Sequence, residues 1–96
     1  MLRHIVMWKL KNADDAPRFK QLLDSCKWLV PDMHEFDVGM RRDDLEANVD
    51  VVLVSSFADQ AALDAYLQHP HHKAVAAQLG PLRDTRSVLD YFPEQP

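Results

Sequence analysis

The sequence contains only two glycines and a single cysteine, Cys26, in 96 residues. So little glycine, together with 47% apolar residues, excludes a fibrous repeat and argues against disorder, so a folded domain is expected. One cysteine cannot form an internal disulfide, and its place on the apolar side of a predicted helix indicates a buried thiol. We therefore expect a reducing, cytoplasmic location.

Other absences narrow the class of function. Eleven Lys and Arg stand against fifteen Asp and Glu, for a net charge of −4, and no long basic cluster is present, so nucleic acid is not an expected partner. No apolar run approaches the roughly 20 residues that span a bilayer, and the N-terminus has no small-residue cleavage site, so no membrane association is expected. The sequence also lacks a glycine-rich phosphate loop, a nucleophile elbow and paired cysteines, and we expect no cofactor.

Two segments predict strands that are apolar on both sides. Residues 2–10 alternate between two sets of side chains, which are Leu2, His4, Val6, Trp8 and Leu10, and Arg3, Ile5, Met7 and Lys9. Residues 51–54 form an unbroken apolar run, VVLV, which is typical of a strand covered on both faces. Residues 32–40 predict a further strand, in which His34, Phe36 and Val38 share one face.

The most regular helical pattern lies within residues 13–30. Its apolar positions recur at helical spacing, at Phe19, Leu22, Leu23, Cys26, Leu29 and Val30. Asp14, Asp15 and Pro17 suit the first turn of this helix. Trp28 lies about half a turn from the apolar stripe, which leaves two interpretations open: a frayed last turn, or a contact with another chain.

The second half of the chain predicts two short helices and a last strand. Asp59 can cap a helix over residues 59–68, and Pro70 both ends that helix and can begin another. Gly80 and Pro81 end the second of these helices, and residues 85–92 read as a strand.

The order of elements is therefore β-α-β-β-α-β, with the second helical layer in two pieces. A single domain over residues 1–96 satisfies it, as a ferredoxin-like α+β fold: a four-stranded antiparallel sheet with its helices on one face. The other face would expose Ile5, Met7, Val52 and Val54, an apolar patch that soluble monomers rarely tolerate. We expect a homodimer in which two sheets pack face to face.

Three of the five histidines lie in the segment AYLQHPHHKAV. If Pro70 is the first helical residue, His69 is the N-cap, and His71 lies to the side of the helix. His72 then heads an apolar stripe that continues at positions 75, 76 and 79, so its side chain should point inward. His69 and His72 could share an ion, but no second Cys/His pair or carboxylate follows at ligand spacing, and no metal site is expected.

An inward His72 near a helix N-terminus should have a lowered pKa and be neutral at pH 7, as a general base requires. Tyr66 lies on the inward face of the preceding helix and could hold a carbonyl or enolate oxygen. If its face of the first strand points toward the helices, His4 would be a third polar side chain in the same space. The expected apolar walls of this small-molecule pocket are Val6, Trp8, Phe19, Leu22 and Leu23. A purely structural interpretation stays open, in which His72 is a core histidine bonded to Tyr66 or to a backbone carbonyl.

Five segments together resemble a known family. RHIVMWKLK, VGM, VVLVSSF, DAYLQHPHHKAV and the terminal VLDY are similar to the stress-responsive dimeric α/β barrel (Dabb) domain, over about residues 1–92. The resemblance implies a ferredoxin-like protomer that pairs into a dimeric barrel. It also implies roles for Tyr66 and His72, because a plant polyketide cyclase of this family uses the matching tyrosine and histidine. His4 matches that cyclase's first-strand histidine, whereas Val51 replaces a further pocket histidine, so a less polar pocket is implied.

Two functions remain as hypotheses. In one, the protein is a cyclase- or lyase-type enzyme in which His72 removes a proton next to the carbonyl of a small apolar keto compound and Tyr66 stabilises the oxygen. In the other, it is a non-enzymatic, stress-associated binding or structural dimer.

Overall fold

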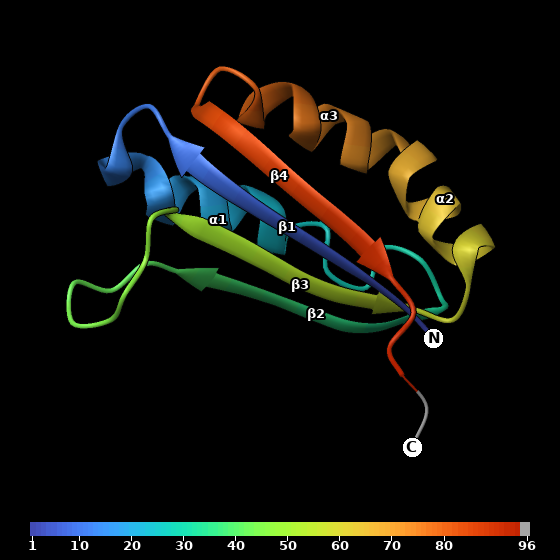
Figure 1. The fold of residues 1–96 in the computed structure, drawn as a ribbon. Coiled ribbons are helices and arrows are strands. Elements are labelled where there is room, and N and C mark those ends of the chain that lie inside the picture. Colours follow the sequence, from blue (N-terminus) through green and yellow to red (C-terminus); the bar gives the residue numbers. More distant parts are fainter. Residues whose placement is uncertain (95–96) are drawn as a thin grey trace.

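The computed structural model describes residues 1–94 and has the predicted order of elements. Its four strands form one antiparallel sheet in the order β2-β3-β1-β4, and the helices lie on one face of this sheet (Figure 1). The elements are β1 (Leu2–Leu10), a 3-10 turn η1 (Ala13–Asp15), α1 (Ala16–Asp24), β2 (Met33–Met40), β3 (Val51–Phe57), α2 (Gln60–Gln68), α3 (Pro70–Leu79) and β4 (Arg83–Tyr91). The predicted ferredoxin-like fold is confirmed.

β1 is a central strand, paired with β3 on one side and with β4 on the other. Alternate residues place His4, Val6 and Trp8 on the inner face of the sheet, the face toward the helices, where all three are buried. The ring of Trp8 meets that of Phe19 from α1 edge-on, with 5.1 Å between the ring centroids. The inner face of β1 therefore forms the floor of the space between sheet and helices.

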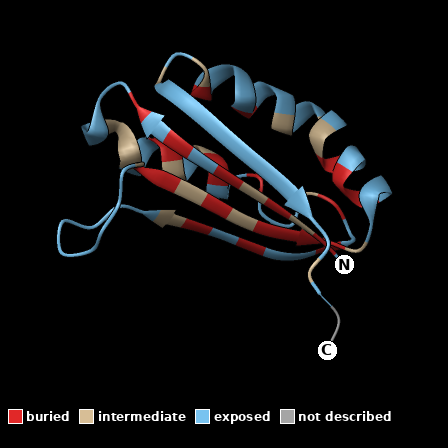
Figure 2. Ribbon diagram, viewed as in Figure 1, coloured by how far each residue is buried: buried red, intermediate tan, exposed pale blue. Residues whose placement is uncertain are grey.

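The opposite, outer face of the sheet is apolar at its centre, and no helix of residues 1–94 covers it. The strand register places Val54 and Leu89 on either side of Ile5. Met7 is 41% exposed and Leu89 is 63% exposed, and Figure 2 shows that β4 is exposed along its length. The outer apolar face consists of Ile5, Met7, Val52, Val54, Leu89 and Tyr91.

The first helix is shorter than its apolar pattern predicts. α1 ends at Asp24, and the hydroxyl of Ser25 donates a hydrogen bond of 2.6 Å to the carbonyl of Leu22. The chain then turns, and Trp28 adopts a φ of 60°, in the left-handed region. Cys26 consequently reaches the core from a turn, whereas Trp28 is 56% exposed. The helix thus ends before Trp28.

The expected orientation of His34 is wrong. The register between β2 and β3 shifts between Met33 and Glu35, which is a β-bulge. The extra residue turns His34 to solvent, while Phe36 and Val38 are buried as predicted.

The two helix starts in the second half of the chain are confirmed. The carboxylate of Asp59 accepts a hydrogen bond of 2.9 Å from the amide of Ala62, at the start of α2. His69 caps α3, and its Nδ1 accepts a hydrogen bond of 3.1 Å from the amide of His71. Because α3 starts at Pro70, Tyr66 lies in the last turn of α2 and His72 in the first turn of α3.

Candidate functional site

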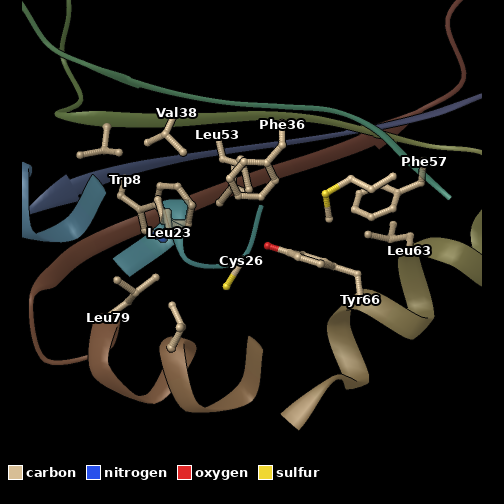
Figure 3. Close-up of a cluster of buried hydrophobic side chains, with 14 of the residues drawn as sticks. Trp8, Leu23, Cys26, Phe36, Val38, Leu53, Phe57, Leu63, Tyr66 and Leu79 are labelled. Atoms are coloured by element: carbon tan, nitrogen blue, oxygen red, sulfur yellow. The ribbon is translucent and has the colours of Figure 1, made fainter. Parts of the chain in front are cut away.

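A cavity of about 120 Å³ lies between the inner face of the sheet and the helices. Figure 3 shows the buried hydrophobic cluster between the strands on one side and the helices on the other, which includes the cavity-lining Trp8, Leu23, Cys26, Leu53, Tyr66 and Leu79. Its lining residues are His4, Val6, Trp8, Leu23, Cys26, Leu53, Tyr66, His72, Val75, Ala76, Leu79, Arg83 and Arg86. The two residues predicted to form a catalytic pair, Tyr66 and His72, therefore share one cavity.

Tyr66 directs its hydroxyl away from α2, toward the thiol of Cys26 (Figure 3). The residue is 1% exposed, and its ring centroid lies 5.3 Å from that of Phe57. Burial, reinforced by the neighbouring Cys26, raises the pKa of the phenol. Tyr66 is thus protonated at neutral pH. Because sulfur is a weak hydrogen-bond acceptor, the hydroxyl is free to donate to a stronger one.

His72 packs directly on Tyr66, with 4.6 Å between the two ring centroids. Its Nδ1 atom is buried and makes no hydrogen bond of normal geometry with residues 1–94. Burial is the main cause that lowers the pKa of His72; the nearby Leu67 carbonyl opposes this effect, and the charge of Arg86 adds to it. The imidazole is therefore neutral at pH 7, as a general base must be.

His4 reaches the cavity from β1 and is held by a carboxylate. Its Nδ1 lies 2.5 Å from Oδ1 of Asp90, which is its neighbour on β4, and the side chain of His4 is 5% exposed. Because a carboxylate only accepts, Nδ1 donates this hydrogen bond, and the contact fixes the orientation of the ring. Asp90 was not among the predicted site residues, because only the pairing of β1 with β4 brings it to His4.

The predicted apolar walls divide into two groups. Val6, Trp8 and Leu23 line the cavity. Phe19 does not, because it is fully buried behind the ring of Trp8, and Leu22 is only partly buried and lies outside the lining. Phe19 therefore supports the cavity wall from behind and is not part of the lining.

Two arginines from β4, Arg83 and Arg86, also line the cavity. The sequence pattern did not predict them as site residues. Arg86 is paired with Trp8, and Arg83 is paired with Leu10, so both lie on the inner side of the sheet. They share that side because the register shifts by one residue between Lys9 and Leu10. In a regular strand, positions three apart point to opposite faces.

The remaining histidines of the segment serve the helices. His69 caps α3, and Nε2 of His71 donates to the hydroxyl of Ser25 over 2.9 Å, which joins α3 to the end of α1. Across residues 1–94 no group of three or more His, Cys, Asp or Glu side chains is placed to hold a metal ion. Within the same residues, no helix has both the length and the apolar character to cross a membrane.

The chain matches the family model of the Stress responsive A/B Barrel Domain (Dabb) over residues 2–93. The protein belongs to this family. A Dabb family protein from Mesorhizobium loti, with a ferredoxin-like fold, is 28% identical over 98% of this chain and 97% of its own, with a TM-score of 0.73. A dimeric ferredoxin-like protein of unknown function from Jannaschia sp. is 28% identical over 96% of this chain and 98% of its own, with a TM-score of 0.79.

An enzyme also shares the fold of this Dabb domain. The hydroxynitrile lyase from Passiflora edulis is 19% identical over 99% of this chain and 94% of its own, with a TM-score of 0.81. At that identity the likeness concerns the fold alone. Among curated proteins, none matches the chain.

Proposed function

We propose that this Dabb domain binds a small carbonyl compound in the cavity and removes a proton from the carbon next to the carbonyl. One observation carries the proposal: Tyr66 and His72 line the same cavity, one as a protonated donor and the other as a neutral base. A carbonyl oxygen that accepts from the Tyr66 hydroxyl would bring its α-carbon close to the imidazole, since the two rings are in contact.

The proton transfer can be assigned to particular atoms. The buried Nδ1 of His72 has no hydrogen-bond partner of normal geometry among residues 1–94, which leaves it turned away from the substrate. We therefore assign the proton of the neutral imidazole to Nδ1. Nε2 then carries the lone pair that takes the substrate proton. The electrons of the broken C–H bond form a carbon–carbon double bond, and the carbonyl electron pair moves to oxygen, where the Tyr66 hydroxyl stabilises the charge. Return of a proton to carbon completes an exchange or an isomerisation.

We also propose that two copies of the chain form a homodimer through their outer apolar faces. That face has no helix over it, although Met7 and Leu89 are large, exposed apolar side chains. A second copy would remove both from water, and the Jannaschia neighbour is described as dimeric. The cavity lies on the other side of the sheet, so a dimer of this kind leaves it accessible.

The catalytic proposal is tested by deuterium exchange followed by proton NMR. Levulinate and methyl levulinate, which carry the same ketone, are incubated in D₂O with wild type, His72→Ala or Tyr66→Phe. We expect wild type to accelerate exchange next to the ketone, with a loss of about 100-fold in each variant, as for removal of a general base or an oxyanion donor.

His71→Ala is the matched control, since His71 is an adjacent histidine in the same helix turn but bonds Ser25 outside the cavity. It should exchange protons as fast as wild type. Near-UV circular dichroism checks that each variant keeps its fold, and His72→Gln replaces His72→Ala if the latter unfolds. Wild type that does not exceed the buffer rate, or a folded His72 variant as active as wild type, would favour the non-enzymatic binding dimer.

A further inference from the structure

The polar lining of the cavity has an excess of positive charge. Arg83 and Arg86 each bring a positively charged guanidinium group to the lining, and neither forms an ion pair with any residue in the range 1–94. Among the described residues, no Asp or Glu lines the cavity, and Asp90, the carboxylate that binds His4, lies outside the lining. The chain as a whole carries a net charge of −4, so the positive charge at the cavity is opposite in sign to the charge of the whole chain.

The two arginines do not lie deep in the cavity with Tyr66. Both are on the exposed edge strand β4, whereas Tyr66 is 1% exposed. Arg86 is also near enough to His72 for its charge to act on the imidazole. The cavity therefore has a neutral hydrogen-bond donor and base inside and two guanidinium groups at its solvent side.

A guanidinium group binds carboxylates in a two-pronged geometry, and here two such groups form no ion pair with residues 1–94. We propose that Arg83 and Arg86 bind the carboxylate of the substrate, so that the substrate class is a short-chain oxo acid rather than a neutral ketone. The cavity volume of about 120 Å³ restricts the part of the ligand beyond the carboxylate to a few carbon atoms. This inference rests on the proposed function, because that function places the carbonyl at Tyr66.

The register shift in β4 is the structural feature that makes this binding site. Without it, Arg83 and Arg86 would point to opposite faces of the sheet, and only one could reach the cavity. Bulges commonly re-aim a side chain next to an active site. Here the bulge brings a second positive charge to the same opening.

The test measures binding and does not depend on turnover. Levulinate and methyl levulinate carry the same ketone and chain, but the first ends in a charged carboxylate and the second in a neutral methyl ester. Their dissociation constants are measured by NMR titration of wild type, Arg86→Gln and Arg83→Gln. We expect wild type to bind levulinate at least tenfold more tightly than the ester, since a charge-assisted hydrogen bond is lost in the ester. Either arginine variant should reduce that preference, and added salt should weaken it.

Arg18→Gln is the control, because Arg18 is an exposed arginine of α1 that does not line the cavity. Its preference for levulinate should equal that of wild type. Equal affinities for the two probes in wild type, no detectable binding of either, or an unchanged preference in both arginine variants would overturn the inference. If wild type and Arg86→Gln exchange protons of both probes at equal rates, the proposed function stands while carboxylate binding is rejected.

Discussion

Leu89→Glu offers a direct test of the proposed association through the outer apolar face. Leu89 keeps 63% of its surface exposed in the single chain, and full burial of a leucine side chain is worth about 1.5–3 kcal/mol. Each copy therefore loses about 1–2 kcal/mol of burial, and a twofold interface contains the change twice, for about 2–4 kcal/mol. Since about 1.4 kcal/mol is tenfold in affinity, the dimer should weaken by about 30- to 700-fold before the cost of burying the carboxylate is added.

Sedimentation equilibrium over a concentration series measures this dimer constant. Leu45→Glu is a closely matched control, because Leu45 is 65% exposed but lies in the loop between β2 and β3. It introduces the same charge at the same exposure away from the outer face, so its dimer constant should equal that of wild type. A wild-type mass that stays monomeric at all concentrations would refute the reasoning, as would a folded Leu89→Glu variant that associates as tightly as the control.

Three further predictions concern the pocket and its support. The pKa of His72 is lowered from 6.5, and the imidazole must be neutral to act as a base. The rate of proton exchange should therefore rise with pH and level off, with a midpoint below 6.5. A midpoint above 6.5 in the pH–rate profile would contradict the role of His72 as the base. Phe19→Ala should lower the free energy of unfolding by about 3–5 kcal/mol in a urea titration, since Phe19 is fully buried behind Trp8; a loss under 1 kcal/mol would contradict its structural role. Asp50→Ala should lower the free energy of unfolding by about 1–3 kcal/mol in the same titration, because the buried carboxylate accepts a 2.8 Å hydrogen bond from the amide of Leu10. The control Asp43→Ala, in the exposed loop, should leave the free energy of unfolding nearly unchanged.

Much of the fold is readable from the sequence because its signals are local. Alternation in β1 separates the two faces, and Asp59 and Pro70 mark helix starts through backbone geometry that depends on a few neighbouring residues. The residue at which α1 ends is harder to predict from the sequence. The apolar spacing continues past Asp24, although the chain leaves the helix there. Periodicity cannot distinguish a last helical turn from a turn that buries Cys26 equally well.

The site was predictable only in part, because some of its members meet through strand pairing. Tyr66 and His72 are close in sequence and share helix faces, so local spacing places them together. Asp90 and the two arginines of β4 reach the site through the antiparallel pairing with β1 and through a bulge that no sequence signal marks. The expected pocket was consequently apolar with three polar tips, and its positive charge was missed.

β1 provides alternate residues to the cavity and to the outer face, and this arrangement restricts how the domain can vary. A slip of β1 by one residue would exchange the two sets, so that Ile5 would enter the cavity and His4 would face the neighbouring copy. Ligand binding and self-association would then fail together. Ligand binding and self-association thus both exclude insertions and deletions within β1. The loop at residues 41–49 contributes to neither surface and can change in length.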